Sequence, residues 1–129
     1  MGQLRRDDGQ AFVEFVLILP LVVGVLFALI EMGIALNDYL RVTDAARIGA
    51  RAAAVARFNP SDQDPCDAAR AAINSQGGDF DFKPGWCVAG LLPNSIKITV
   101  QKDQTIDIPF LPVSKPDITL SSSATEKIE

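Results

Sequence analysis

The apolar residues of this chain are concentrated near its start. Residues 15–30 form a run of 16 uncharged positions, and only Pro20 and Gly24 interrupt its apolar character. Glu14 and Glu31 border this run, and a second apolar stretch follows Glu31. A bilayer core of about 30 Å is spanned by roughly 20 predominantly apolar helical residues. The pattern therefore predicts a single membrane-spanning helix.

The helical pattern continues beyond the apolar run. Residues 43–57 are rich in alanine, which favours helix in water, and Asn59-Pro60 gives a stop. A continuous helix over residues 11–57 has 47 residues and a length of about 70 Å at 1.5 Å per residue. A membrane accommodates less than half of that length, so we expect the second half to project into water.

This second half carries small residues four positions apart, which permit close helix packing. They form two stripes, Ala46-Ala50-Ala54 and Ala45-Gly49-Ala53. We expect at least one stripe to pack on the chain's own sheet and the other to be available to a partner subunit.

Residues 58–129 predict a small domain. Residues 67–75 favour a short helix, Gly77-Gly78 ends it, and Pro84-Gly85 marks a turn. Three segments alternate apolar and polar residues as strands do, at residues 95–103, 105–110 and 117–125. The first two are close enough for a hairpin. The expected fold class is α+β: a long N-terminal hydrophobic helix, a short helix and an antiparallel sheet of about three strands, covered on its apolar face by the helices.

Composition and charge exclude several functions. The mean hydropathy is +0.19, which is high for a small domain. The formal charge of −4 lies entirely in residues 58–129, because residues 1–57 hold 6 basic and 6 acidic residues. An acidic domain is a poor nucleic-acid binder. The chain has no histidine, which excludes Ser-His-Asp and Cys-His nucleophiles and the usual zinc sites. We therefore expect no enzyme, cofactor or metal.

Five aspartates surround the two cysteines: Asp62, Asp64, Asp67, Asp79 and Asp81. Oxygen-rich clusters bind calcium, but this spacing does not match an EF-hand loop. A solvated acidic surface is the favoured interpretation, and Phe82 and Trp86 nearby are expected in the core.

Cys66 and Cys87 are expected to form a disulfide. The bond closes a loop of 22 residues, and chain entropy makes it worth about 3 kcal/mol. The alternative is two buried free thiols in a cytosolic domain. A disulfide places the C-terminal domain outside the reducing cytosol. Flanking arginines are nearly balanced across the span and do not decide the orientation.

Glu14 lies at the edge of the apolar run, where a carboxylate is costly unless it sits at headgroup depth. Its surroundings form a pattern: it is the fifth residue after Gly9, and Phe15 is the sixth. A polar leader with basic residues precedes Gly9, and the apolar helix follows.

This arrangement resembles the processing site of type IV pilins of the Tad (tight adherence) branch, and residues 9–51 are similar to the TadE family of pseudopilins. The similar positions are Gly9, Ala11, Val13-Glu14-Phe15, Leu19-Pro20, Glu31-Met32-Gly33, Ala45-Ala46-Arg47 and Gly49-Ala50-Arg51. The similarity covers about the first 55 residues.

The resemblance implies that a prepilin peptidase cuts between Gly9 and Gln10. The chain then divides into a leader (1–9), a transmembrane and protruding assembly helix (10–57) and an extracytoplasmic α+β domain (58–129). The implied role is that of a minor pilin in Tad pilus assembly. The implied location is the inner membrane of a bacterium, with incorporation into the pilus as a further option. The implied partners are other pilin and pseudopilin subunits, the peptidase, the inner-membrane assembly platform and the lipid bilayer, with no nucleic acid.

A physical hypothesis accompanies the motif. Cleavage creates an α-amine on Gln10, about one helical turn from Glu14. In a helix bundle, this amine neutralises Glu14 of a neighbouring subunit. Pro20 and Gly24 are expected to loosen the helix; the alternative is a proline of the kind that ordinary membrane helices tolerate. The alternative function is a membrane-anchored extracytoplasmic binding module with an uncleaved signal anchor.

Overall fold

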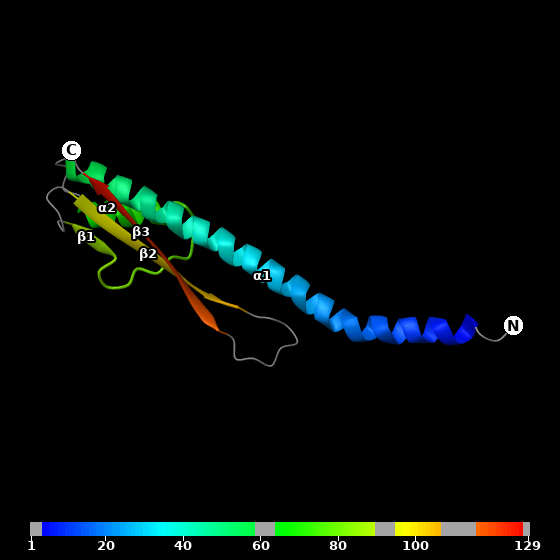
Figure 1. Cartoon of the computed structure of the whole chain (residues 1–129). Helices are drawn as coiled ribbons and strands as arrows, with labels where there is room; N and C mark the ends of the chain where they lie inside the picture. Colours follow the sequence, from blue (N-terminus) through cyan, green and yellow to red (C-terminus); the bar gives the residue numbers. More distant parts are fainter. Residues whose placement is uncertain (1–3, 59–63, 90–94, 107–115, 128–129) are drawn as a thin grey trace.

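A computed structural model describes residues 4–58, 64–89, 95–106 and 116–127. The chain forms two helices and three strands in the order α1 (Leu4–Phe58), α2 (Pro65–Asn74), β1 (Cys87–Ala89), β2 (Ser95–Thr105) and β3 (Asp117–Lys127). The C-terminal half of α1 lies against the other elements, and its N-terminal half extends away from them (Figure 1). This arrangement confirms the expected α+β class.

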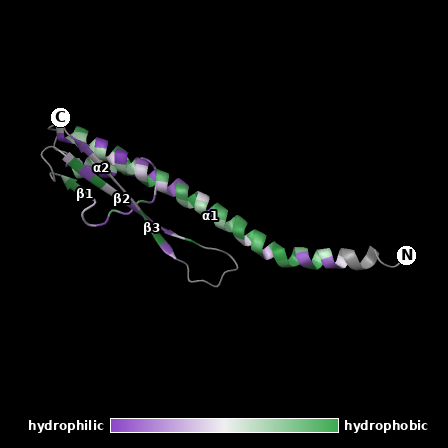
Figure 2. Cartoon of the chain, in the orientation of Figure 1, coloured by the Kyte–Doolittle hydropathy of each residue, from purple (hydrophilic) through white to green (hydrophobic). Residues whose placement is uncertain are grey.

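Helix α1 is continuous, as the sequence predicts. It begins seven residues before the expected start, at Leu4, and ends at Phe58. The expected stop at Asn59-Pro60 follows immediately and lies outside the described residues. Hydrophobic residues dominate the projecting half, whereas polar and apolar positions alternate in the half beside the sheet (Figure 2).

Helix α2 begins two residues earlier than the predicted 67–75. The Oδ1 atom of Asp64 accepts a hydrogen bond from the Cys66 N–H at 2.8 Å, and Pro65 occupies the first turn. Aspartate before a helix and proline at its first position are favourable start signals. This Asp-Pro pair therefore sets the start of α2.

The sheet is antiparallel in the order β1-β2-β3. Strands β2 and β3 pair along their whole length, from Ser95 opposite Lys127 to Thr105 opposite Asp117. The predicted strands at 95–103 and 117–125 are confirmed and extend further than expected.

The predicted hairpin between residues 95–103 and 105–110 is wrong. Thr105 ends β2, whose two edges are occupied by β1 and β3, and residues 107–110 lie outside the described residues. The third strand is Cys87–Ala89, which follows the expected turn at Pro84-Gly85. There Gly85 has φ +84°, and the Trp86 N–H bonds to the Lys83 carbonyl at 3.0 Å.

The core joins the inner face of β2 to small residues of α1. Ile96, Ile98 and Val100 are fully buried together with Ile73 of α2. Both small-residue stripes lie in this core, because Ala45, Ala46, Ala50 and Ala53 are all buried. The expected packing of one stripe is confirmed, but the expectation that the other stays free for a partner is wrong.

At Gly49, α1 lies very close to both α2 and β2. A Cβ atom at Gly49 would lie 2.7 Å from Ile73 Cδ1 and 3.3 Å from Ile98 Cγ2. Because tightly packed interiors tolerate added volume poorly, α1 can lie this near to α2 only without a side chain here.

We therefore expect Gly49→Leu to lower the free energy of unfolding by about 2 kcal/mol through overpacking. Thermal unfolding of the detergent-solubilised chain, followed by the near-ultraviolet signal of Trp86, measures this change. Gly33→Leu is the matched control, since no neighbour lies within 4 Å of a Cβ there. Equal stability of the two variants would contradict the packing argument.

Candidate assembly site

The projecting half of α1 presents apolar side chains on all sides. No residue from Gly9 to Asn37 is buried, and the large apolar side chains that lie exposed between Phe12 and Leu36 have exposed fractions of 44–72%. This segment is about 43 Å long at 1.5 Å per residue, and the helix is long and apolar enough to cross a membrane. Lipid or other apolar helices must cover such a surface in the functional state.

The processing motif lies at the start of this segment. Gly9, Gln10, Glu14 and Phe15 are all exposed on the continuous helix. The Gln10 Nε2 donates a hydrogen bond to Glu14 Oε1 at 3.4 Å, one helical turn away. The structure thus places residues 10 and 14 on one face of the helix, and the pairing of the Gln10 amine with Glu14 of a neighbouring subunit stays a prediction.

Pro20 and Gly24 lie inside α1 without interrupting it. Proline removes one backbone hydrogen bond from a helix and favours a bend. Helix α1 changes direction within its blue N-terminal part, which contains Pro20 (Figure 1). The role of Pro20 and Gly24 in loosening the helix stays a prediction.

An ion pair marks the point where α1 meets the domain. The Lys102 Nζ of β2 lies 2.8 Å from Asp38 Oδ2, and the two side chains are only 25% and 12% exposed. From Gly9 onward, Asp38 is the first buried residue along α1. The pair therefore connects β2 to α1 immediately after the exposed apolar segment of the helix ends.

Sequence reasoning missed this pair because its partners are 64 positions apart. One signal was present. Ile96, Ile98 and Val100 occupy the inward positions of β2, and the next inward position is Lys102. A lysine in an otherwise apolar series indicates a buried carboxylate partner.

The expected disulfide between Cys66 and Cys87 is confirmed and joins the first turn of α2 to β1. Phe82 and Trp86 pack beside it against the core with ring centroids 4.7 Å apart. The guanidinium of Arg70, which the sequence did not single out, lies 5.4 Å and 5.2 Å from these two rings. Arg70 thus connects α2 to the aromatic pair that precedes β1.

The five aspartates do not form a metal site among the residues that the structure describes. Asp64 caps α2, the backbone of Asp81 bridges to Gln101, and Asp62 lies outside the described part.

Residues 9–51 match the family model described as TadE-like protein. The segment is TadE-like. The match covers a third of the 129-residue chain, from Gly9 to Arg51, and so includes the apolar half of α1 and part of the half under the sheet. No curated protein and no solved structure matches the chain significantly.

The TadE-like match covers the part of α1 that is long and apolar enough to cross a membrane. Together with the exposed apolar helix, it indicates that the chain is anchored in a membrane. It confirms the resemblance that the motif around Glu14 and the Ala/Arg groups had indicated.

We expect Asp38→Asn to lower the free energy of unfolding by about 2 kcal/mol, since it leaves the Lys102 ammonium half-buried and unpaired. Lys102→Met in the same chain should recover part of this loss, and a double-mutant cycle measures the coupling. Lys83→Gln is the control, because Lys83 lies 3.7 Å from Asp103 and both side chains are 50% exposed. Its cost should stay below about 0.5 kcal/mol. No coupling between residues 38 and 102 would contradict the role of the pair.

Proposed function

We propose that the chain is a TadE-like pseudopilin that takes part in Tad (type IVc) pilus assembly. In this proposal, a prepilin peptidase cleaves between Gly9 and Gln10, and the apolar half of α1 then packs against helices of other pilin subunits and the assembly platform. The observation that carries the proposal is the exposed apolar surface of residues 9–37 within the segment that matches the TadE-like family.

The amine–carboxylate contact supplies a physical reason for processing to precede assembly. The side chain of Gln10 already reaches Glu14 in the intact chain. Cleavage adds a positive charge to the backbone nitrogen of the same residue. In a bundle, that charge offsets the cost of burying Glu14 of a neighbouring subunit, whereas an uncleaved chain offers no such charge.

The proposed location is the inner membrane, with a single pass and the C-terminal domain outside the cytoplasm. The Cys66–Cys87 disulfide supports this orientation, because structural disulfides persist in oxidising compartments. The ion pair between Asp38 and Lys102 then lies near the membrane–water boundary on the extracytoplasmic side of the inner membrane.

A membrane-anchored binding module with an uncleaved signal anchor is the second candidate. The continuity of α1 from Leu4 through the Gly9-Gln10 bond favours it, since the leader and the span form one unbroken helix. The two candidates differ in the first residue of the mature chain.

Mass spectrometry of the chain extracted from membranes of a strain with active prepilin peptidase tests the processing. We expect a mature N-terminus at Gln10, and the full-length chain in a strain that lacks the peptidase. If residues 1–9 are retained in both strains, the signal-anchor function replaces the pseudopilin proposal.

Glu14→Gln tests the assembly step with a nearly isosteric neutral side chain. We expect normal cleavage but a loss of about 3 kcal/mol per helix contact, because the neighbour's amine stays buried without a partner. Incorporation into sheared pili, measured by immunoblot, should fall at least about tenfold. Glu31→Gln serves as the matched control at the other end of the apolar run. Normal incorporation of the Glu14→Gln chain would refute the charge-pairing mechanism.

A further inference from the structure

Among the residues that the structure describes, strand β3 forms an open edge of the sheet. It pairs with β2 on one side over all of Asp117–Lys127, and no described residue forms a backbone hydrogen bond with its other side. An edge of this length is a template for the addition of another strand.

The register identifies the backbone groups at that open edge. The Thr99 N–H bonds to the Trp86 carbonyl at 2.7 Å, and the Gln101 carbonyl accepts from the Asp81 N–H at 2.8 Å. The backbone N–H and C=O groups of the odd-numbered residues of β2 therefore point away from β3, and those of the even-numbered residues bond to β3. Since Ile98 and Val100 lie opposite Ala124 and Ser122, even-numbered residues of β3 bond to β2. The outer edge consequently presents the N–H and C=O groups of Thr119, Ser121, Ser123 and Thr125.

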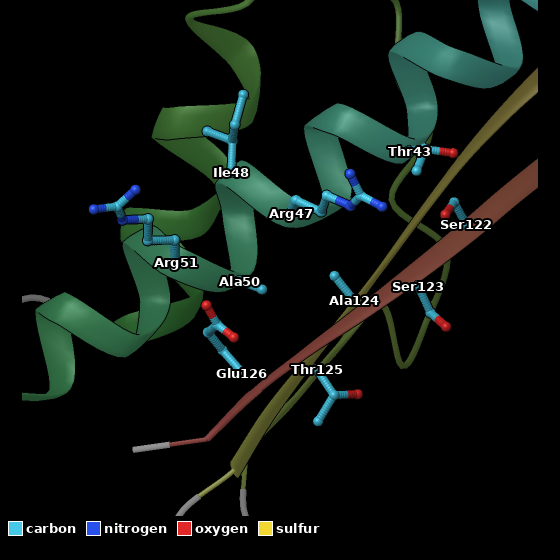
Figure 3. A pocket seen from close by; sticks show the side chains of 10 residues that line it. All are labelled: Thr43, Arg47, Ile48, Ala50, Arg51, Ser122, Ser123, Ala124, Thr125 and Glu126. Carbon is cyan, nitrogen blue, oxygen red and sulfur yellow. The ribbon is translucent and has the colours of Figure 1, made fainter. Parts of the chain in front are cut away.

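A groove of about 660 Å³ runs along this edge, between β3 and α1. Residues 122–126 line it consecutively. A groove over one face of a strand would touch alternate residues, so consecutive lining places it along the backbone edge. Ser122, Ala124 and Glu126 are directed toward α1, and Ser123 and Thr125 away from it (Figure 3).

The wall that α1 contributes is basic. Arg47 extends toward β3, whereas Arg51 points away from it (Figure 3). Neither arginine forms an ion pair with a carboxylate of the described residues. Glu126 supplies the one acidic side chain of the lining. The small side chains of Ala50 and Ala124 leave room between the two walls.

We propose that this groove binds an extended, acidic segment of a partner protein, which adds as a strand to the outer edge of β3 and places a carboxylate against Arg47. Backbone hydrogen bonds to Ser121, Ser123 and Thr125 supply affinity, and Arg47 selects for negative charge. This surface is separate from the helix packing of the proposed pilin function and does not depend on cleavage at Gly9.

A second copy of this chain fits the groove poorly. Antiparallel pairing of two β3 strands creates a two-fold axis perpendicular to the strands. Because β3 runs alongside α1 in Figure 1, that axis would also reverse one α1 relative to the other. Two chains anchored in one membrane with the same orientation cannot adopt this arrangement.

The test uses the full chain in detergent and fluorescent peptides of alternating threonine and glutamate, with alternating threonine and lysine as the control probe. Fluorescence anisotropy should show binding of the glutamate peptide and at least about tenfold weaker binding of the lysine peptide. Arg47→Glu should lower the affinity for the glutamate peptide at least about tenfold, and Glu126→Gln should raise this affinity. Arg41→Glu, with the same charge change on α1 outside this groove, should leave binding unchanged.

The backbone contribution is tested by proline at the edge. Ser123→Pro removes an outward N–H and no bond to β2, so it should weaken peptide binding at least about fivefold while the unfolding temperature stays close to that of Ser123→Ala. Equal binding of the two peptides, or binding unaffected by both Arg47→Glu and Ser123→Pro, would overturn the proposal. Efficient cross-linking of two Ser123→Cys chains in membranes would also overturn it, because a second copy would then occupy the edge.

Discussion

The close packing of α1 on α2 and β2 is the contact on which the rest of the structure depends. Gly49 brings the helix against Ile73, and alanines on either side allow the inner face of β2 to lie on the same surface. Small side chains contribute little apolar area each, but they let two backbones approach closely. The C-terminal half of α1 therefore forms, together with Ala69 and Ile73 of α2, the surface on which the apolar face of the sheet packs.

This packing makes one helix serve two environments. The half from Asp38 onward buries one face in the domain, and the half before Asp38 leaves its apolar side chains exposed. The ion pair to Lys102 lies at the boundary, and the Cys66–Cys87 disulfide lies in the α2–β1 part of the domain. No loop separates these two halves, because α1 is one continuous helix from Leu4 to Phe58.

Local periodicity predicted the elements whose determinants lie within a few residues. The apolar run and the alanine-rich stretch gave α1, and the alternating residues around Ile98 and Leu120 gave β2 and β3. Strand β1 was missed because three residues are too few to show a period, and their pairing depends on β2. The ion pair of Asp38 and the stacking of Arg70 were missed because their partners come from distant segments. In the motif at Gly9–Phe15, the spacing of residues 10 and 14 was predictable because it is a property of any helix.

The open edge of β3 shows how the helix also limits which molecules the domain meets. Native edges are normally protected by short length, proline, bulges or inward charges, and β3 has eleven residues with no proline. Here α1 provides the protection instead. It forms one wall of the groove and places Arg47 beside the edge. An added acidic strand therefore binds with a more favourable free energy than a neutral or basic one. Membrane anchoring of the same helix adds a second restriction, because it fixes the direction of β3 and so disfavours antiparallel pairing with an identical chain. The edge thus discriminates between added strands because it lies next to α1, whose orientation is set by its anchoring in the membrane.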